Sequence, residues 1–324
     1  MDYAHCRLCP RQCGVNRLEA AGFCRCGSSP RVARAALHFW EEPCISGVRG
    51  SGTVFFSGCT LKCCFCQNYS ISSGGFGKDI DVRRLGDIFL ELEDKGAHNI
   101  NLVTPTQYLP SILAALDLVR HRLTIPIVYN SGGYERPETI RELDGYVDIY
   151  LPDLKYFDSS LSGRYSAAPD YFSFASRAIS AMIRQTGAPA LAEEEGCTLM
   201  KKGVIIRHMV LPGQKEDSKK LLRWMKESLP EGRFFLSLLS QYTPFFRSSE
   251  FPEINRRITT YEYHQVLDFA ISLGLTAGFM QKKSSAREEN SLALLLFLFI
   301  PKALHSFYKA LGSVKKARNS AGSH

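Results

Sequence analysis

Short apolar runs alternate with helical patterns through the middle of the chain, and this alternation limits the possible folds more than any other feature. Six runs resemble β-strands: 53–57, 100–103, 125–129, 147–151, 204–210 and 234–239. Strands that alternate with helices predict parallel pairing with right-handed crossovers. Eight such units would close a full barrel. Six therefore favour a partial α/β barrel, and a doubly wound parallel sheet remains the alternative.

The helices between these runs are also readable. Leu85, Ile88, Phe89 and Leu92 share one face of a helix. Pro110 suits the first turn of a helix that continues over 112–119. Near the end of the series, Thr259 and Glu262 have the spacing of a capping box and predict a helix start there.

Cysteine is distributed very unevenly. The chain has 11 cysteines, and ten of them lie within the first 66 residues. An odd number, in a chain that does not begin with the basic-then-apolar pattern of a signal peptide, argues against a disulfide framework. Clustered thiols in a reducing compartment usually bind metal. We therefore expect a cytoplasmic metalloprotein.

The most informative cysteines follow the first predicted strand. Cys59, Cys63 and Cys66 have the spacing C-x3-C-x2-C, and short loops of this kind wrap thiolates around an iron–sulfur cluster. Three ligands leave one iron of a four-iron cluster open, as a catalytic metal site requires. The alternative is a structural zinc site with Cys44 or Cys64 as fourth ligand. Because Cys64 is adjacent to Cys63, we expect it to be a packed thiol.

This loop resembles that of the radical S-adenosylmethionine (radical SAM) superfamily. Stretches 37–47, 96–106 and 147–156 are further similar to the PflX-type homologues of pyruvate formate-lyase activating enzymes, and the resemblance covers roughly residues 5–289. It implies a partial (βα)6 radical SAM barrel with a small N-terminal Cys-rich segment. It also implies that Cys59, Cys63 and Cys66 hold a [4Fe–4S] cluster whose open iron binds SAM, with Phe65 against the adenine.

The resemblance implies an oxidoreductase activity as well. The reduced cluster cleaves SAM to methionine and a 5′-deoxyadenosyl radical, which abstracts hydrogen from a protein or small-molecule substrate. A glycine of a partner glycyl-radical enzyme is the donor suggested by the activating enzymes. A flavodoxin- or ferredoxin-type protein would supply the electron.

Candidate SAM-site residues follow the other predicted strands, where parallel α/β folds place their active groups. Asp153 and Lys155 match the Asp-x-Lys signature of the activating enzymes and are the catalytic candidates. Alternation allows only one of Arg207 and His208 to face inward, and the resemblance makes Arg207 the candidate for the SAM carboxylate. The cofactor-binding candidates are Phe65, Asn68, Thr104, Asn130, Lys155, Arg207 and Gln241.

Two of these positions depart from the activating enzymes. Thr104 opens a Thr-Pro-Thr-Gln sequence where those enzymes usually carry Gly-Gly-Glu, and Gln241 lies where they often have histidine. Both departures keep open a rival function, a noncatalytic zinc or iron–sulfur protein that binds a partner.

A second cysteine group precedes the barrel. Cys6, Cys9, Cys13 and Cys24 have the spacing C-x2-C-x3-C-x10-C, and Cys26 is an alternative to Cys24. Four thiols within about twenty residues suit a second iron–sulfur cluster or zinc, and we favour iron–sulfur. A segment this short would gain most of its folding energy from the metal.

These patterns divide the chain into a Cys-rich metal-binding segment (1–45), a radical SAM core (46–281) and a divergent tail (282–324). The apolar run 292–300 in the tail is far shorter than the roughly 20 residues of a membrane-spanning helix, so we do not expect a membrane protein. The net charge of +8 includes a basic tail. Without a basic stripe interleaved with aromatic residues elsewhere, we do not expect nucleic acid as a partner.

Overall fold

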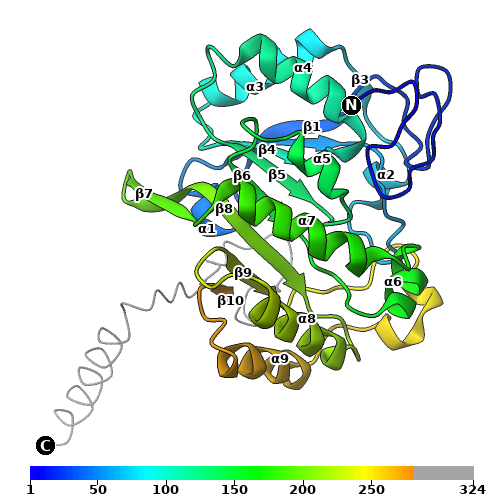
Figure 1. Cartoon of the computed structure of the whole chain (residues 1–324), viewed down its shortest axis with the longest axis vertical. Coiled ribbons are helices and arrows are strands. Elements are labelled where there is room, and N and C mark those ends of the chain that lie inside the picture. Colours follow the sequence, from blue (N-terminus) through cyan, green and yellow to red (C-terminus); the bar gives the residue numbers. More distant parts are fainter. Residues whose placement is uncertain (281–324) are drawn as a thin grey trace, which may run out of the picture.

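The computed structural model describes residues 1–280, which form a mixed α/β fold around one open sheet (Figure 1). The predicted divergent tail, 282–324, lies outside these residues. Six parallel strands correspond to the six predicted runs and follow one another across the sheet in chain order. They are β2 (Ser51–Phe56), β4 (Ile100–Val103), β5 (Ile127–Ser131), β6 (Ile149–Pro152), β8 (Cys197–Met209) and β9 (Phe235–Leu239). This arrangement confirms the α/β fold class with its parallel sheet.

Helices cover the outer face of the sheet (Figure 1). The crossovers contain α3 (Val82–Asp94), α4 (Leu109–Val119), α5 (Pro137–Arg141), α7 (Tyr171–Thr186), α8 (Lys215–Ser228) and α9 (Thr260–Ser272). Their apolar sides form one core with outward-facing strand residues such as Val54, Leu102 and Leu236. The helix α9 begins with the predicted capping box, in which Thr259 and Glu262 bond each other's backbone N–H groups.

The inner face of the sheet is filled differently toward the N-terminal ends of the strands. The short helix α1 (Pro43–Ser46) packs Cys44 and Ile45 against a small cluster of inward-facing residues, which includes Val128, Ile149 and Ile205. Further along the same strands the inward positions carry polar side chains such as Asn130 and Arg207. Polar partners for a ligand are therefore concentrated toward the C-terminal ends of the strands.

Several strands lie outside the predicted series. Strand β10 (Gly278–Met280) adds a parallel strand beside β9. At the other edge β1 (Arg31–His38) pairs antiparallel with β2 and with β3 (Lys78–Asp79), so the segment 1–45 contributes a strand to the main sheet. A hairpin joins β7 (Ala190–Glu194) to the extended start of β8. The remaining helices are α2 (Tyr69–Ser72), α6 (Ser159–Ser166) and the 3-10 turns Thr106–Tyr108, Ser248–Glu250 and Pro252–Ile254.

Residues 1–30 form no helix or strand, and they dock beside α2 as the dark blue segment of Figure 1. Hydrogen bonds attach them to the barrel. The Tyr3 hydroxyl lies 2.8 Å from Ser111 Oγ, Thr139 Oγ1 donates to the carbonyl of Leu8 at 2.7 Å, and Arg11 Nε donates to the carbonyl of Thr60 at 2.9 Å. The Cys-rich segment is thus fixed directly to the loop that carries the C-x3-C-x2-C cysteines.

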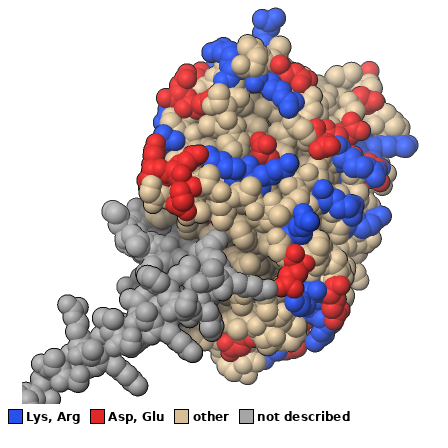
Figure 2. Space-filling view, turned by 60° about the vertical axis from the view of Figure 1, so that its left-hand side comes forward, with Lys and Arg blue, Asp and Glu red and all other residues tan. Residues whose placement is uncertain are grey.

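Two features concern the helices and one face of the molecule. None of the helices in residues 1–280 is both long enough and apolar enough to cross a bilayer. On the face shown in Figure 2, acidic and basic side chains are interspersed with uncharged surface.

Candidate active site

The cysteine loop follows β2, and each predicted cysteine sulfur lies beside a hydrogen-bonding group. The N–H of Leu61 donates to Cys59 Sγ at 3.4 Å, and the Ser166 hydroxyl donates to Cys63 Sγ at 3.0 Å. Cys66 Sγ lies 3.2 Å from Ser72 Oγ. Donors at sulfur stabilise the thiolate form, which is the form that binds metal.

The electrostatics of the loop require a metal to keep these sulfurs ionised. Burial, with smaller contributions from the neighbouring thiols Cys63 and Cys66, raises the pKa of Cys59 to about 12. Burial also raises the pKa of Cys63, although Lys155 opposes that shift. Without metal Cys59 and Cys63 are therefore neutral at pH 7, so metal binding must displace their protons.

The donor set fits an iron–sulfur cluster better than a single zinc ion. In residues 1–280 no three His, Cys, Asp or Glu side chains converge closely enough to hold one metal ion. In a cluster the cysteines bind different iron atoms and need not meet at one point. Cys64 is buried in the hydrophobic core, as expected for a packed thiol. The three remaining cysteines of the loop match a cluster with one open iron.

The two catalytic candidates form an ion-paired group with Arg207. Lys155 Nζ donates to one carboxylate oxygen of Asp153 at 2.6 Å, and Arg207 Nε donates to the other at 3.1 Å. Burial alone would raise the pKa of Asp153, but Lys155 and Arg207 outweigh it and hold that pKa below its ordinary value. The Asp153 carboxylate is therefore ionised at neutral pH and fixes the two cations.

A glutamate that the sequence analysis did not select completes this network. Glu41, from the loop before α1, accepts from Arg207 Nη1 at 3.1 Å and from the amides of Asn101 and Asn130, each at 3.2 Å. Arg207 also donates to Asn130 Oδ1. Burial raises the pKa of Glu41, and Arg207 opposes the shift. The side chains of Glu41 and Arg207 are only 10% and 15% exposed, so the network lies inside the barrel.

The inner face contains buried polar atoms with few or no protein partners among the described residues. The clearest case is Asn101 Oδ1, whereas the carboxylate of Glu42 and the hydroxyl of Ser237 lie beside each other. A buried polar group without a partner costs about 1–3 kcal/mol, so such atoms indicate a site that a polar ligand or water completes. Asn101 gave a signal in the sequence, because it is a polar residue within an otherwise apolar strand. Glu41 and Glu42 lie in a loop, and no local pattern marks them.

The two cations of the network keep donors available for a ligand. A guanidinium group carries five N–H donors and an ammonium group three. Arg207 spends three on Asp153, Glu41 and Asn130, and Lys155 spends one on Asp153. Both side chains can therefore bind a carboxylate while they keep their protein partners.

Thr104 holds a strained backbone at the end of β4. Its φ is +56°, in the left-handed region that favours glycine and is unusual for a β-branched residue. Its N–H donates to the carbonyl of Asn130 at 2.8 Å, and its carbonyl accepts from Gln107 Nε2 at 2.7 Å. The chain thus adopts a glycine-like turn here although the Gly-Gly-Glu sequence is missing.

The other predicted residues lie around the network rather than in it. Phe65 is buried, and its ring lies edge-on to the ring of Tyr242 with 5.6 Å between the ring centroids. Asn68 is exposed directly before α2, and Gln241 is exposed in the loop after β9. His208 faces the helices, with Nε2 2.9 Å from Ser218 Oγ. Burial lowers the pKa of His208 to about 4, so it is a neutral packed histidine and Arg207 is the inward residue.

Glu135 is a second carboxylate that the sequence did not single out. It is 1% exposed, and its Oε1 accepts from Thr106 Oγ1 at 2.7 Å. The hydroxyls of Ser131 and Tyr129 also lie close to this carboxylate and oppose the effect of burial on its pKa. Burial raises the pKa of Glu135 to about 7. It therefore changes charge near neutral pH, close to the end of β5.

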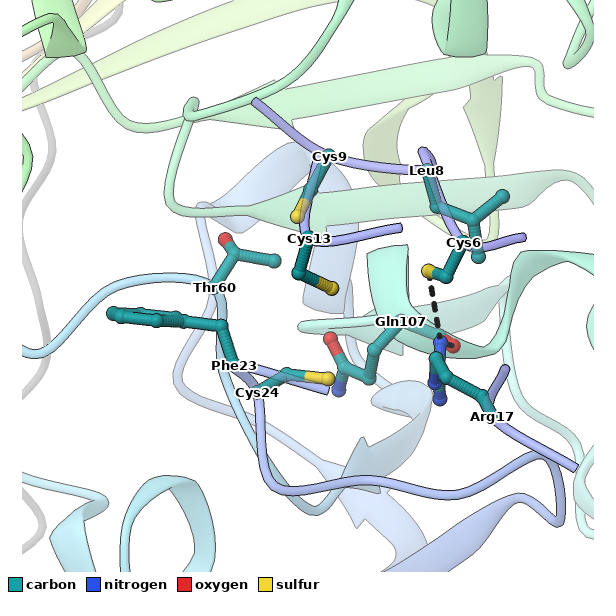
Figure 3. Close-up of a pocket in the computed structure, with 9 residues that line it drawn as sticks. All are labelled: Cys6, Leu8, Cys9, Cys13, Arg17, Phe23, Cys24, Thr60 and Gln107. Carbon is teal, nitrogen blue, oxygen red and sulfur yellow. Dashed lines mark hydrogen bonds between the residues drawn. The ribbon is translucent and has the colours of Figure 1, made fainter. Parts of the chain in front are cut away.

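The four N-terminal cysteines are brought together as well. Cys6, Cys9, Cys13 and Cys24 line one cavity, and Figure 3 shows their sulfur atoms around its central space. Cys26 lies outside the lining, with its sulfur donating to the carbonyls of Cys24 and Ser57 at 3.3 and 3.4 Å. Of the two alternatives for the fourth position, the structure thus places Cys24 at the cavity.

The cysteine loop and most of the polar network lie in a region that matches a known protein family. The model of the Radical SAM superfamily matches residues 53–225. Uncharacterized protein MJ0674 of Methanocaldococcus jannaschii is 32% identical over 278 residues, which cover 83% of this chain and 75% of that protein.

Solved structures are more distant. SuiB of Streptococcus suis bound to S-adenosylmethionine has a TM-score of 0.41 and 17% identity, over 66% of this chain and 42% of that chain. HydG, a maturase of the [FeFe]-hydrogenase, has a TM-score of 0.47 and 12% identity, over 68% of this chain and 49% of that chain. The chain thus spans less than half the length of either structure.

Proposed function

Because the chain belongs to the radical SAM superfamily, we propose that Cys59, Cys63 and Cys66 hold its catalytic [4Fe–4S] cluster and that the polar network inside the barrel holds SAM. The observation that carries the proposal is the ion-paired group of Asp153, Lys155 and Arg207. Lys155 is close enough to Cys63 for each charge to shift the other's pKa. This proximity supports assigning the network and the cysteine loop to one site.

When bound, the cluster supplies the electron that cleaves SAM to methionine and a 5′-deoxyadenosyl radical. The residues of the chain position SAM for this chemistry. Arg207 and Lys155 donate to the methionyl carboxylate, because their remaining N–H groups suit a carboxylate. Asp153 orients both cations and attracts the methionyl ammonium group. Burial of the network excludes water from the reacting atoms.

The other predicted residues have supporting roles in this proposal. The Phe65 ring, already packed on Tyr242, lies against the adenine. Asn130 holds Arg207 in place. The backbone of Thr104, with its glycine-like turn, takes the part of the missing Gly-Gly-Glu sequence. Asn68 and Gln241 contact SAM from the exposed rim.

For the substrate we propose a glycyl radical enzyme, as for the PflX-type activating enzymes that the sequence resembles. The support is the likeness of segments 37–47, 96–106 and 147–156, and Glu41 and Asp153 of the network belong to two of these segments. Radical SAM enzymes generally take their electron from flavodoxin or ferredoxin, and we expect a donor of that type in the cytoplasm.

SAM binding at the cluster can be tested by electron paramagnetic resonance. Protein reconstituted with iron and sulfide is reduced with dithionite under anaerobic conditions, and spectra are recorded with and without SAM. We expect SAM to change the signal of the reduced cluster. The SAM-sensitive signal should be lost in Cys66→Ala but kept in the control Cys197→Ala, because Cys197 lies in the hairpin of β7 and β8, outside the proposed site. A wild-type spectrum that SAM leaves unchanged would overturn the proposal.

A further inference from the structure

The N-terminal cysteines form a site of their own beside the catalytic loop. Cys6, Cys9, Cys13 and Cys24 come from a segment without helix or strand, yet they surround one cavity (Figure 3). A Cβ atom built on Gly22 would lie 3.4 Å from Cys13 Sγ and 3.6 Å from Cys24 Sγ, so these two sulfurs flank the same point. An irregular segment with its thiols gathered in this way is typical of chains folded around a metal.

The charges around the cavity show that it is built for an anion. Arg17 is 2% exposed, and its guanidinium donates to Cys6 Sγ and to the carbonyls of Cys26, Gln107 and Gly27. No carboxylate of residues 1–280 pairs with it. A buried cation without a negative partner is unfavourable. A metal-bound thiolate at Cys6 supplies negative charge directly beside Arg17.

More cations lie at the same edge. Phe23 lines the cavity, and two cations lie over its ring. Arg11 Cζ is 4.1 Å and Lys62 Nζ is 5.1 Å from the ring centroid. Neither cation has a carboxylate within ion-pair distance among the described residues. Arg17, Arg11 and Lys62 thus place positive charge beside the four thiols, which suits a negatively charged group bound through thiolates.

The arrangement of the four thiols favours one type of metal group. A tetrahedral zinc site needs its four ligands to meet at one ion, but no three Cys, His, Asp or Glu side chains in residues 1–280 converge in that way. Four thiols that surround a cavity without meeting suit a cubane cluster, in which each thiolate binds a different iron. With four protein ligands every iron is occupied, so such a cluster has no open position for SAM.

We propose that Cys6, Cys9, Cys13 and Cys24 hold a second, fully ligated [4Fe–4S] cluster, separate from the catalytic cluster, with Arg17 as its buried counter-charge. The N-terminal site lies next to the loop of the catalytic cysteines. Thr60 lines the cavity and directly follows Cys59, and Arg11 binds the carbonyl of Thr60 at 2.9 Å. The second cluster thus holds the irregular segment against the loop that carries the catalytic cysteines.

The test separates the two clusters by removing the catalytic one. The triple variant Cys59→Ala/Cys63→Ala/Cys66→Ala is reconstituted anaerobically, and its iron, sulfide and zinc contents are measured. We expect about four iron and about four sulfide atoms per chain, and a reduced-cluster resonance signal that SAM does not change. The triple variant with zinc and no sulfide, or with no metal, would overturn the second cluster.

Matched variants then test the ligand set. In the triple-variant background, Cys24→Ala should abolish the iron, whereas Cys26→Ala, two residues away but outside the cavity, should retain it. Loss of iron in Cys26→Ala alone would contradict the assignment of Cys24. The outcome does not depend on SAM cleavage: wild-type protein that fails to cleave SAM would contradict the proposed function, while four irons in the triple variant would still support the second cluster.

Discussion

Arg207 gives the most specific prediction for SAM binding, because its N–H groups can be counted. Three are used by Asp153, Glu41 and Asn130, and the remaining ones are available for the methionyl carboxylate. In Arg207→Lys a single ammonium group with three donors replaces the five-donor fork. It cannot serve all the protein partners and the ligand at once. At least one charge-assisted hydrogen bond to SAM is therefore lost.

A hydrogen bond to a charged group contributes about 1.5–3 kcal/mol. Its loss should therefore raise the dissociation constant of SAM by about 10- to 150-fold. Equilibrium dialysis of SAM against anaerobically reconstituted protein measures this change. Arg233→Lys is the control, because Arg233 is exposed directly before β9, at the opposite ends of the strands. Equal iron content and equal circular dichroism would show that the fold and the cluster are intact. An unchanged dissociation constant in Arg207→Lys would refute the role of Arg207.

Three other substitutions test the surroundings of the site. The pKa of Glu135 is raised to about 7, so its neutral form stabilises the fold at low pH, and this stability is lost as the pH rises from about 4.5 to about 7. The free energy of unfolding of Glu135→Gln, measured with urea, should therefore exceed that of the wild type by about 3 kcal/mol at pH 8 and equal it near pH 4.5. A difference that does not change with pH would contradict the raised pKa of Glu135. Thr104→Gly relieves about 1–3 kcal/mol of backbone strain, but the added entropy of the unfolded chain costs about 0.4–1 kcal/mol. The free energy of unfolding in urea should therefore rise by about 1 kcal/mol, and a clear decrease would argue against strain at Thr104. Cys64→Ala should keep its iron content, because Cys64 packs in the core, and a loss of iron would make Cys64 a ligand.

Much of the fold could be predicted because the parallel strands and their helices have strong local patterns. The run 100–103 coincides with β4, and the capping box at Thr259 begins α9 with the predicted geometry. Elements with weaker patterns were not predicted. Strand β1 carries no clear alternation of buried and exposed residues, and β10 has only three residues. Both depend on pairing with a neighbouring strand rather than on their own sequence.

The candidate site shows the same division. Asp153, Lys155 and Arg207 could be selected because they lie at or near the ends of predicted strands and match positions that the resemblance to the activating enzymes marks. Glu41 could not, since its position depends on how the loop before α1 folds back into the barrel. Glu135 has an ordinary sequence context, and only burial makes it unusual. Local sequence thus identified the groups on strands, and the tertiary structure was needed for those on loops.

The central claim, that this chain cleaves SAM reductively at Cys59, Cys63 and Cys66, is tested most directly by its product. Wild-type protein and Cys63→Ala are reconstituted anaerobically, reduced with dithionite and incubated with SAM, and 5′-deoxyadenosine is measured by chromatography. The account predicts product from the wild type and none from the variant, although the variant keeps the iron of the N-terminal site. A wild-type protein that carries a reducible cluster but forms no 5′-deoxyadenosine, or a variant that forms as much as the wild type, would contradict it.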